Sequence, residues 1–214
     1  MLAAGAGRRF GGGKLLAPFA GAPLIQRTLE AVCAESFAEV LVVTGEETPA
    51  IAAALEGLAC RIVPAPEWRE GMAASLRAGI AALAPDTEGA FIFLGDMPLV
   101  PVALCGELAA RASQAGYAAR PVVGGKPGHP AAFMRAAFAD LMQLAGDSGA
   151  NRLLAGRADV AYCEAADEGA LIDIDAPGDL AAAELAWKAR ATSATSASAI
   201  SRGDLPKPGS PMGA

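Results

Sequence analysis

The stretch from Leu2 to Leu16 combines glycines with cationic side chains in a pattern suited to binding phosphate groups. Its glycines and charged residues are Gly5, Gly7, Arg8, Arg9, Gly11, Gly12, Gly13 and Lys14. Glycine adopts positive φ and lets the backbone approach a ligand closely, so successive N–H groups can point at one anion. The arginines and the lysine add full positive charge to the same loop. The pattern predicts a loop that holds a nucleoside triphosphate.

Two common nucleotide-binding motifs do not account for this loop. The Walker A motif requires Ser or Thr after its lysine, and here Leu15 follows Lys14. The dinucleotide fingerprint would need a third glycine where this chain has Phe10, and no acidic residue closes a strand about 20 residues further on. A flexible loop with incidental charges is the alternative, but packing does not explain Arg9 or Lys14.

Asp96 is a candidate metal ligand. The apolar residues 90–94 predict a buried strand, and the following Gly-Asp-Met-Pro sequence ends that strand with the Asp96 carboxylate at its tip. Mg²⁺ prefers oxygen ligands and shares them with substrate phosphates. Beside a triphosphate loop, Asp96 is therefore predicted to bind Mg²⁺. An ordinary aspartate in a turn is the alternative.

A second acidic pair, Asp173 and Asp175, lies shortly before Pro177. Alternation in a short strand would place both carboxylates on one face, so that both could reach one ion. The sequence does not decide which of the two coordinates, although Asp175 is preferred. Strand-end aspartates before a Pro-Gly turn and a helix are the alternative.

Three further polar residues stand at candidate ligand positions. Ser75 lies near the start of a helix predicted to open at Gly71, where backbone N–H groups favour an anion, although it is equally well explained as an ordinary helix residue. His129, the only histidine, lies in a Gly- and Pro-rich loop. Asp147, or its neighbour Ser148, is either part of the site or a cap for a helix over 151–154.

The elements that must position these residues alternate between strands and helices. Buried strands are expected over 40–43, 61–63 and 90–94, and helices over 24–33, 48–58 and 72–83. This alternation predicts an α/β protein with a mostly parallel sheet, a three-layer Rossmann-like nucleotide-binding fold. Ligands of such sheets bind at the carboxyl ends of the strands, where the glycine loop and Asp96 fall.

The length and composition of the chain indicate one domain with a substantial hydrophobic core. The chain has 214 residues, of which 53% are hydrophobic and 19% charged. We expect one folded domain over 1–190 and a disordered low-complexity tail over 191–214. Because only residues 1–3 precede the glycine loop, the first strand should be short, or the chain truncated at its start.

Charge, hydropathy and cysteine spacing exclude several classes of protein. The net charge of −6 argues against nonspecific nucleic-acid binding. No stretch of eighteen apolar residues and no signal peptide is evident, so we expect a cytoplasmic protein without a membrane partner. The four cysteines are widely spaced, and reduced thiols are expected rather than a zinc site: Cys33, Cys60, Cys105 and Cys163.

Together these motifs resemble the MobA-like nucleotidyltransferases, over nearly the whole chain to about residue 188. That family opens with Leu-Ala-Ala-Gly or Leu-Ala-Gly-Gly, followed by an Arg-Met/Phe-Gly element and a lysine; the matching residues are Leu2, Ala3, Ala4, Gly5, Gly7, Arg9, Phe10, Gly11 and Lys14. Its Gly-Asp-x-Pro element matches Asp96, and its Asn/Asp-Ile-Asn/Asp-Thr-Pro stretch matches the Asp173–Asp175 region. Ala3-Ala4-Gly5 is more similar to the cytidylyltransferase branch than to the guanylyltransferase branch.

The resemblance implies transfer of CMP from CTP to the phosphate of molybdopterin, with Mg²⁺ as cofactor and pyrophosphate as product. It implies catalytic roles for Arg9, Lys14 and Asp96, and metal binding by Asp96 with Asp175 or Asp173. The implied nucleotide-binding residues are Leu2, Ala3, Ala4, Gly5, Gly7, Arg9, Lys14, Ser75 and Asp96. His129 and Asp147 would contact the acceptor. The attacking phosphate oxygen is already ionised, so His129 is expected to position it rather than to move a proton.

Two other classes of function stay open. One is an NAD(P)H-dependent oxidoreductase of the same fold, with the glycine loop holding a dinucleotide. The other is a carrier that delivers molybdenum cofactor to a xanthine dehydrogenase-type molybdoenzyme. The presence of Asp96 with both Asp173 and Asp175 argues against a carrier, because a carrier needs no metal site.

Overall fold

The computed structural model describes residues 1–5, 7–147 and 149–203, and of Arg8 and residues 193–203 only the backbone. Its strands are β1 (Leu2–Ala3), β2 (Pro18–Phe19), β3 (Ala22–Pro23), β4 (Leu41–Thr44), β5 (Arg61–Pro64), β6 (Gly89–Ile92), β7 (Ala118–Val123), β8 (Lys126–Pro127), β9 (Ala131–Met134) and β10 (Val160–Glu164). Its α-helices are α1 (Leu24–Cys33), α2 (Thr48–Ala54), α3 (Met72–Ala81), α4 (Cys105–Ala115), α5 (Phe138–Met142), α6 (Asn151–Leu154) and α7 (Pro177–Gly203).

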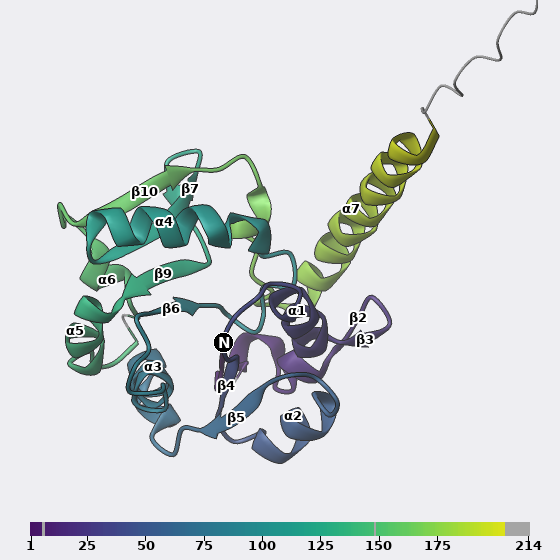
Figure 1. Cartoon of the computed structure of the whole chain (residues 1–214). Coiled ribbons are helices and arrows are strands. Elements are labelled where there is room, and N and C mark those ends of the chain that lie inside the picture. Colours follow the sequence, from purple (N-terminus) through teal and green to yellow (C-terminus); the bar gives the residue numbers. More distant parts are fainter. Residues whose placement is uncertain (6, 148, 204–214) are drawn as a thin grey trace, which may run out of the picture.

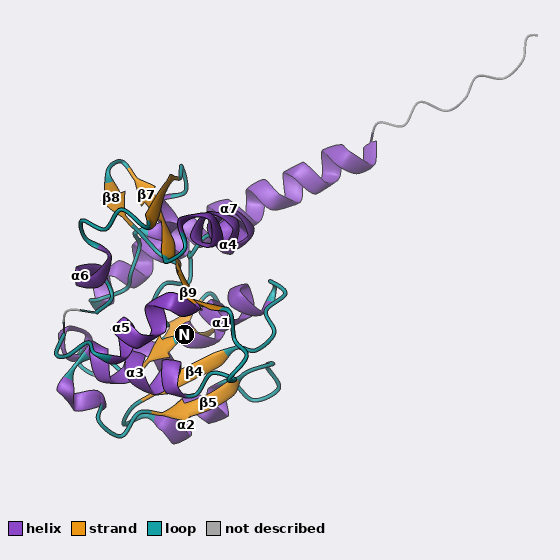
Figure 2. Ribbon diagram, turned by 60° about the vertical axis from the view of Figure 1, so that its left-hand side comes forward, coloured by secondary structure: helices purple, strands orange, loops and turns teal. Residues whose placement is uncertain are grey.

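The strands form a three-stranded sheet, β1–β4–β5, and a five-stranded sheet that contains β6 to β10, and a parallel bridge between Leu2 and Leu94 joins them into the mostly parallel arrangement that the sequence predicts (Figure 2). Parallel pairs join β5 to β4 and β4 to β1. Leu2 then bonds the chain just beyond β6, its N–H donating to the Phe93 carbonyl at 2.8 Å and its carbonyl accepting from Gly95 N–H at 2.9 Å. The sheet continues from β6 through β9 and β7 to β10, and β9 runs antiparallel to its neighbours.

Helices cover both faces of this sheet and complete three layers (Figure 1). On one face, Ile25 and Leu29 of α1 and Ile51 of α2 pack with Phe93 in a buried cluster. On the other face, Leu76 of α3 packs with Ile92 and with residues of α5 and α6. Because Ile92 and Phe93 are adjacent, they point to opposite faces, and the apolar run 90–94 is explained by burial on both sides.

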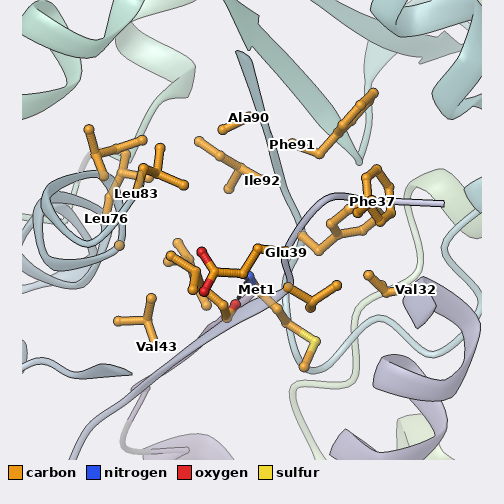
Figure 3. A pocket seen from close by; sticks show the side chains of 16 residues that line it. Met1, Val32, Phe37, Glu39, Val43, Leu76, Leu83, Ala90, Phe91 and Ile92 are labelled. Atoms are coloured by element: carbon orange, nitrogen blue, oxygen red, sulfur yellow. Dashed lines mark hydrogen bonds between the residues drawn. The ribbon is translucent and has the colours of Figure 1, made fainter. Parts of the chain in front are cut away.

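The first strand is short, as predicted, and it begins inside the protein. β1 has 2 residues between β4 and β6, which have 4 each. The ammonium group of Met1 is buried and donates a hydrogen bond of 2.7 Å to the Leu41 carbonyl. Desolvation lowers the pKa of this ammonium from 8.0 to about 5. A mainly apolar cavity of about 90 Å³ lies beside Met1, between side chains of β4, β6 and α3 (Figure 3).

Several boundaries differ from the sequence-based expectations. Helix α2 ends at Ala54 instead of 58 because Gly57 has φ +85°, outside helical geometry, and α3 ends at Ala81. The segment containing Asp173 and Asp175 is not a strand, which corrects that prediction: Ile174 N–H donates to the Asp96 carbonyl at 3.1 Å instead of joining a ladder.

Helix α7 packs only its first part onto the body of the protein and then extends away from it (Figure 1). Trp187 of α7 meets Phe19 of β2 edge-on, with the ring centroids 5.6 Å apart. The domain boundary predicted at 190 falls within this helix and stays a prediction, and residues 204–214 lie outside the described part of the chain. None of the helices within the described residues is long and apolar enough to cross a bilayer.

Candidate active site

The glycine loop leaves the carboxyl end of β1 and folds back on itself before it reaches Lys14. Gly7 accepts backbone hydrogen bonds from Phe10 N–H at 2.9 Å and from Gly12 N–H at 3.1 Å. The residues at 11, 12 and 13 have φ of +92°, +94° and +63°, a run that side chains with a Cβ would strain. This turn places Lys14 at the start of a short 3-10 helix, Lys14–Leu16, with its side chain directed back to the sheet.

Lys14 lies between two of the three aspartates predicted to bind metal, Asp96 and Asp175. Its Nζ is 2.6 Å from Asp96 Oδ2 and 3.3 Å from Asp175 Oδ1, and its side chain is 11% exposed. Arg9 Nη1 lies 2.8 Å from Asp175 Oδ2 on the solvent side, with its own side chain 79% exposed. The structure therefore brings together Arg9, Lys14, Asp96 and Asp175 in one alternating cluster of charges.

Hydrogen bonds to the backbone hold Asp96 and Asp175 next to each other. The buried Thr28 hydroxyl donates to the Gly95 carbonyl at 3.0 Å and so fixes the turn before Asp96. The Ile174–Asp96 backbone hydrogen bond brings the second acidic segment to that turn. Asp179 then accepts from the N–H groups of Asp175 and Ala176 at 2.9 and 2.7 Å, and these bonds hold the pKa of Asp179 below its usual value.

The cluster has the donor chemistry that Mg²⁺ requires. Asp96 Oδ1 is buried and has no hydrogen-bond partner, which is unfavourable for a carboxylate oxygen unless a ligand completes it. Asp173 lies on the other side of Ile174, and burial, followed by the charge of Asp175, raises its pKa. Among the described residues no three carboxylate, His or Cys side chains form a ready-made cage, because Lys14 stands between the carboxylates. These oxygens fit a cation that is shared with a phosphate ligand.

A cavity of about 480 Å³ opens above this cluster. Of the predicted site residues, those lining it are Leu2, Ala4, Gly5, Gly7, Arg9, Lys14, Ser75, Asp96, Asp147 and Asp175. Ala3 does not line this cavity; it is 5% exposed and packs in the core within β1. The volume and the cationic rim suit a nucleotide.

The far wall of this cavity is the start of α3, which carries Ser75. Gly71 precedes the helix with φ +114°, and a Cβ there would lie 2.5 Å from Asp147 Oδ1. The loop containing Asp147 therefore packs directly on this helix start, where Ala73 N–H donates to the Gly146 carbonyl at 3.0 Å. The capping alternative for Asp147 is wrong: α6 begins after Ala150 without a side-chain cap, and Ser148 lies outside the described residues.

A second cavity of about 300 Å³ adjoins the first. Leu2, Met72, Leu94 and Asp147 line both cavities. His129 lines only the second cavity and Asp147 lines both, so the two predicted acceptor residues share the second cavity. Asp173, predicted as a possible metal ligand, also lines only the second cavity. Burial, and then the charge of Arg120, lowers the pKa of His129 to about 4. His129 is thus neutral near pH 7.

Two pairs of residues that line these cavities and could contact a ligand were not predicted from the sequence. Trp68 and Arg69 line the first, with the Arg69 guanidinium 4.5 Å from the Trp68 ring centroid. Arg120 and Asn151 line the second. An aromatic and a cationic residue just before the Gly71 helix start were a visible signal for the first pair. Nothing in the local sequence marked the second pair, because it forms only when β7 and α6 pack together.

The glycine loop after β1 and the Asp96 turn after β6, both at the carboxyl ends of parallel strands, define a nucleotide-binding α/β protein. A model of the MobA-like NTP transferase domain matches residues 1–164, and the chain belongs to this family.

Two solved structures are similar over most of the chain. The homologue of Rv0371c from Mycobacterium sp. strain JC1 is 28% identical with a TM-score of 0.76, and 87% of this chain and 93% of that chain are covered. Rv0371c of Mycobacterium tuberculosis H37Rv, crystallised with manganese, is 27% identical with a TM-score of 0.65, covering 83% and 92%.

A curated relative, the nicotine blue oxidoreductase of Paenarthrobacter nicotinovorans, is 36% identical over 109 residues, which are 50% of this chain and 53% of the relative. The chain thus matches about half the length of this relative.

Proposed function

We propose that this chain transfers CMP from CTP to the phosphate of a molybdopterin-type acceptor and releases pyrophosphate. The observation that carries the proposal is the Lys14, Asp96 and Asp175 cluster at the base of a nucleotide-sized cavity that opens directly into a second cavity. Two adjoining cavities are what a reaction between a nucleotide and a separate acceptor requires. Membership of the MobA-like NTP transferase family supports a nucleotidyltransferase.

In the proposed reaction an oxygen of the acceptor phosphate bonds to the α-phosphorus of CTP, and the bond from that phosphorus to the bridging oxygen of pyrophosphate breaks. Arg9 and Lys14 lie where they would neutralise the triphosphate, and Ser75 adds a hydroxyl at the start of α3. Catalysis of this kind depends on positioning and on charge stabilisation, and no protein group needs to take a proton.

Asp96 with Asp175 or Asp173 would hold Mg²⁺. The bound cation would neutralise phosphate charge as the transition state forms. The partnerless, buried Oδ1 of Asp96 supports this assignment, as does the relative from M. tuberculosis that was crystallised with manganese. The choice of CTP rests on the resemblance of Ala3-Ala4-Gly5 to the cytidylyltransferase branch.

The test is pyrophosphate release with molybdopterin and Mg²⁺, offering CTP, GTP and ATP in parallel. Release with CTP alone would support both the reaction and the base. Release with GTP alone would keep the nucleotidyl transfer and overturn the base. No release with any of the three, from protein that circular dichroism shows to be folded, would overturn the proposed function.

An oxidoreductase activity is the second candidate, and the similarity to the nicotine blue oxidoreductase favours it. The same glycine loop would then hold the phosphates of a dinucleotide. Titration of the protein with NADPH, followed by the fluorescence of the nicotinamide ring, distinguishes the two functions. Saturable NADPH binding that CTP does not displace would favour the oxidoreductase.

A further inference from the structure

Arg120 is a buried cation in the wall of the second cavity. It lies in the middle of β7, and its residue is 3% exposed. Its Nε and Nη2 donate to the Gly128 carbonyl at 3.3 and 2.9 Å, and its Nη1 donates to Asn151 Oδ1 at 2.6 Å. None of the ion pairs found among the described residues includes Arg120.

Packing alone does not explain a guanidinium at this position. Charged groups are expensive to bury and are normally paired with an opposite charge. Here burial lowers the pKa of Arg120, but arginine stays protonated in proteins, so the positive charge persists. Both contacts are to neutral oxygens, which satisfy part of the N–H set of a guanidinium and leave donors over. The arrangement is therefore incomplete without an anion.

No described side chain that lines the second cavity balances the charge of Arg120 with an ion pair. His129 and Asn151 line the cavity beside Arg120, and both are neutral near pH 7, so neither balances the charge. The carboxylates of the same cavity, Asp147 and Asp173, form no ion pair with Arg120. Arg120 does not line the first cavity, so it is set apart from the Lys14 cluster.

We propose that Arg120, supported by Asn151, binds an anionic group at the end of the acceptor opposite its attacking phosphate. Only the identification of the ligand as the acceptor rests on the proposed function. The anion site itself follows from the contacts of Arg120. The substrate class is then a bifunctional molecule, with a nucleophilic phosphate that reaches the first cavity and a second negative group, in the second cavity, that a guanidinium fork recognises. Arg120 determines specificity in this site and takes no part in the chemical step.

The direct test follows the Arg120 side chain by ¹H–¹⁵N NMR of protein labelled with ¹⁵N-arginine. The Arg120 Nε resonance is assigned by its absence from the Arg120→Gln variant, or from Arg120→Lys if the glutamine variant does not fold. Titration with methyl phosphate should shift this resonance saturably, and sodium chloride at the same ionic strength should not. A resonance that methyl phosphate leaves in place, or that chloride shifts equally, overturns the proposal.

The kinetic test compares Arg120→Gln with Arg135→Gln as a matched control. Arg135 is an exposed arginine that donates to the carbonyls of Pro85 and Thr87 and lines neither cavity. In Arg120→Gln the KM for the acceptor should rise at least tenfold, with kcat and the Kd for CTP changed less than threefold; in the control all three should stay near wild type. An unchanged acceptor KM overturns the specificity role.

The two readouts separate this proposal from the proposed function. If the wild-type protein releases no pyrophosphate but methyl phosphate still shifts the Arg120 resonance, the anion site stands and the transfer reaction falls. If the wild-type protein turns over and the Arg120 variant matches it in both tests, the reaction stands and the anion site falls.

Discussion

Replacement of Lys14 by methionine should strengthen divalent cation binding while it weakens nucleotide binding. The Lys14 ammonium occupies the place between Asp96 and Asp175 that a shared cation would take. Methionine keeps much of the length and the apolar stem of lysine and removes the charge. The variant therefore leaves the two carboxylates facing each other without the cation that now separates them.

The structure sets the size of both effects. The Lys14–Asp96 contact is 2.6 Å long, and the two side chains are 11% and 20% exposed. A hydrogen bond that involves charged groups contributes about 1.5–3 kcal/mol. A metal ion that needs both carboxylates must displace this bond in the wild-type protein but not in the variant. Mn²⁺ should therefore bind the variant roughly tenfold to a hundredfold more tightly, and CTP should bind it more weakly by a similar factor.

Isothermal titration calorimetry with Mn²⁺, first without and then with CTP, measures both constants. Lys126→Met is the matched control, because Lys126 is exposed in β8 and lines neither cavity. The control should bind Mn²⁺ and CTP as the wild-type protein does. If Lys14→Met binds Mn²⁺ no more tightly than the control, the lysine does not compete with a cation, and the assignment of the metal site to these carboxylates is refuted.

Three further outcomes follow from the structure. Asp96→Ala should lower the rate of pyrophosphate release by at least about a hundredfold while the protein stays folded; a near-normal rate with Mg²⁺ would remove Asp96 from the site. Gly71→Ala should destabilise the protein by about 1–3 kcal/mol in urea denaturation because of its φ of +114°, whereas Gly106→Ala, in α4 with nothing within 4 Å, should not. The pKa of the Met1 ammonium is lowered to about 5, so between about pH 5 and 8 the unfolded chain binds more protons than the folded protein. The free energy of unfolding should therefore rise with pH over that window, by at most about 4 kcal/mol. Equal values from denaturation at pH 5.5 and 8 would contradict this.

The sequence carried enough information to predict the elements whose residues are buried by local pattern. Helix α1 has the predicted bounds, and β4, β5 and β6 lie on the predicted apolar runs, because periodic burial leaves a repeating signal in the sequence. The glycine loop, Lys14 and Asp96 of the first cavity were also predictable, since glycine, lysine and strand-end aspartate have few structural uses together.

The remaining features depend on contacts between distant parts of the chain. Asp173 and Asp175 alternate about the buried Ile174 as a strand would, but one hydrogen bond to the Asp96 turn replaces the ladder. Arg120 looks like a surface residue in a strand until β7 is covered by its neighbours. Lys14 separates two carboxylates, rather than only binding phosphate, because Asp96 and Asp175, which lie 82 and 161 positions beyond it in the chain, come together around it.

Because the ammonium of Met1 is buried beside β4, a residue added ahead of Met1 would extend β1. A residue joined ahead of Met1 would turn its desolvated ammonium into an ordinary amide that still donates to Leu41, the bond that an interior strand residue makes. Its side chain would meet the cavity beside Met1, between Ile92 of β6 and Val43 of β4 (Figure 3). An apolar residue added here would thus pair within the middle of the sheet. A charged affinity tag fused directly ahead of Met1 would place polar residues in the core.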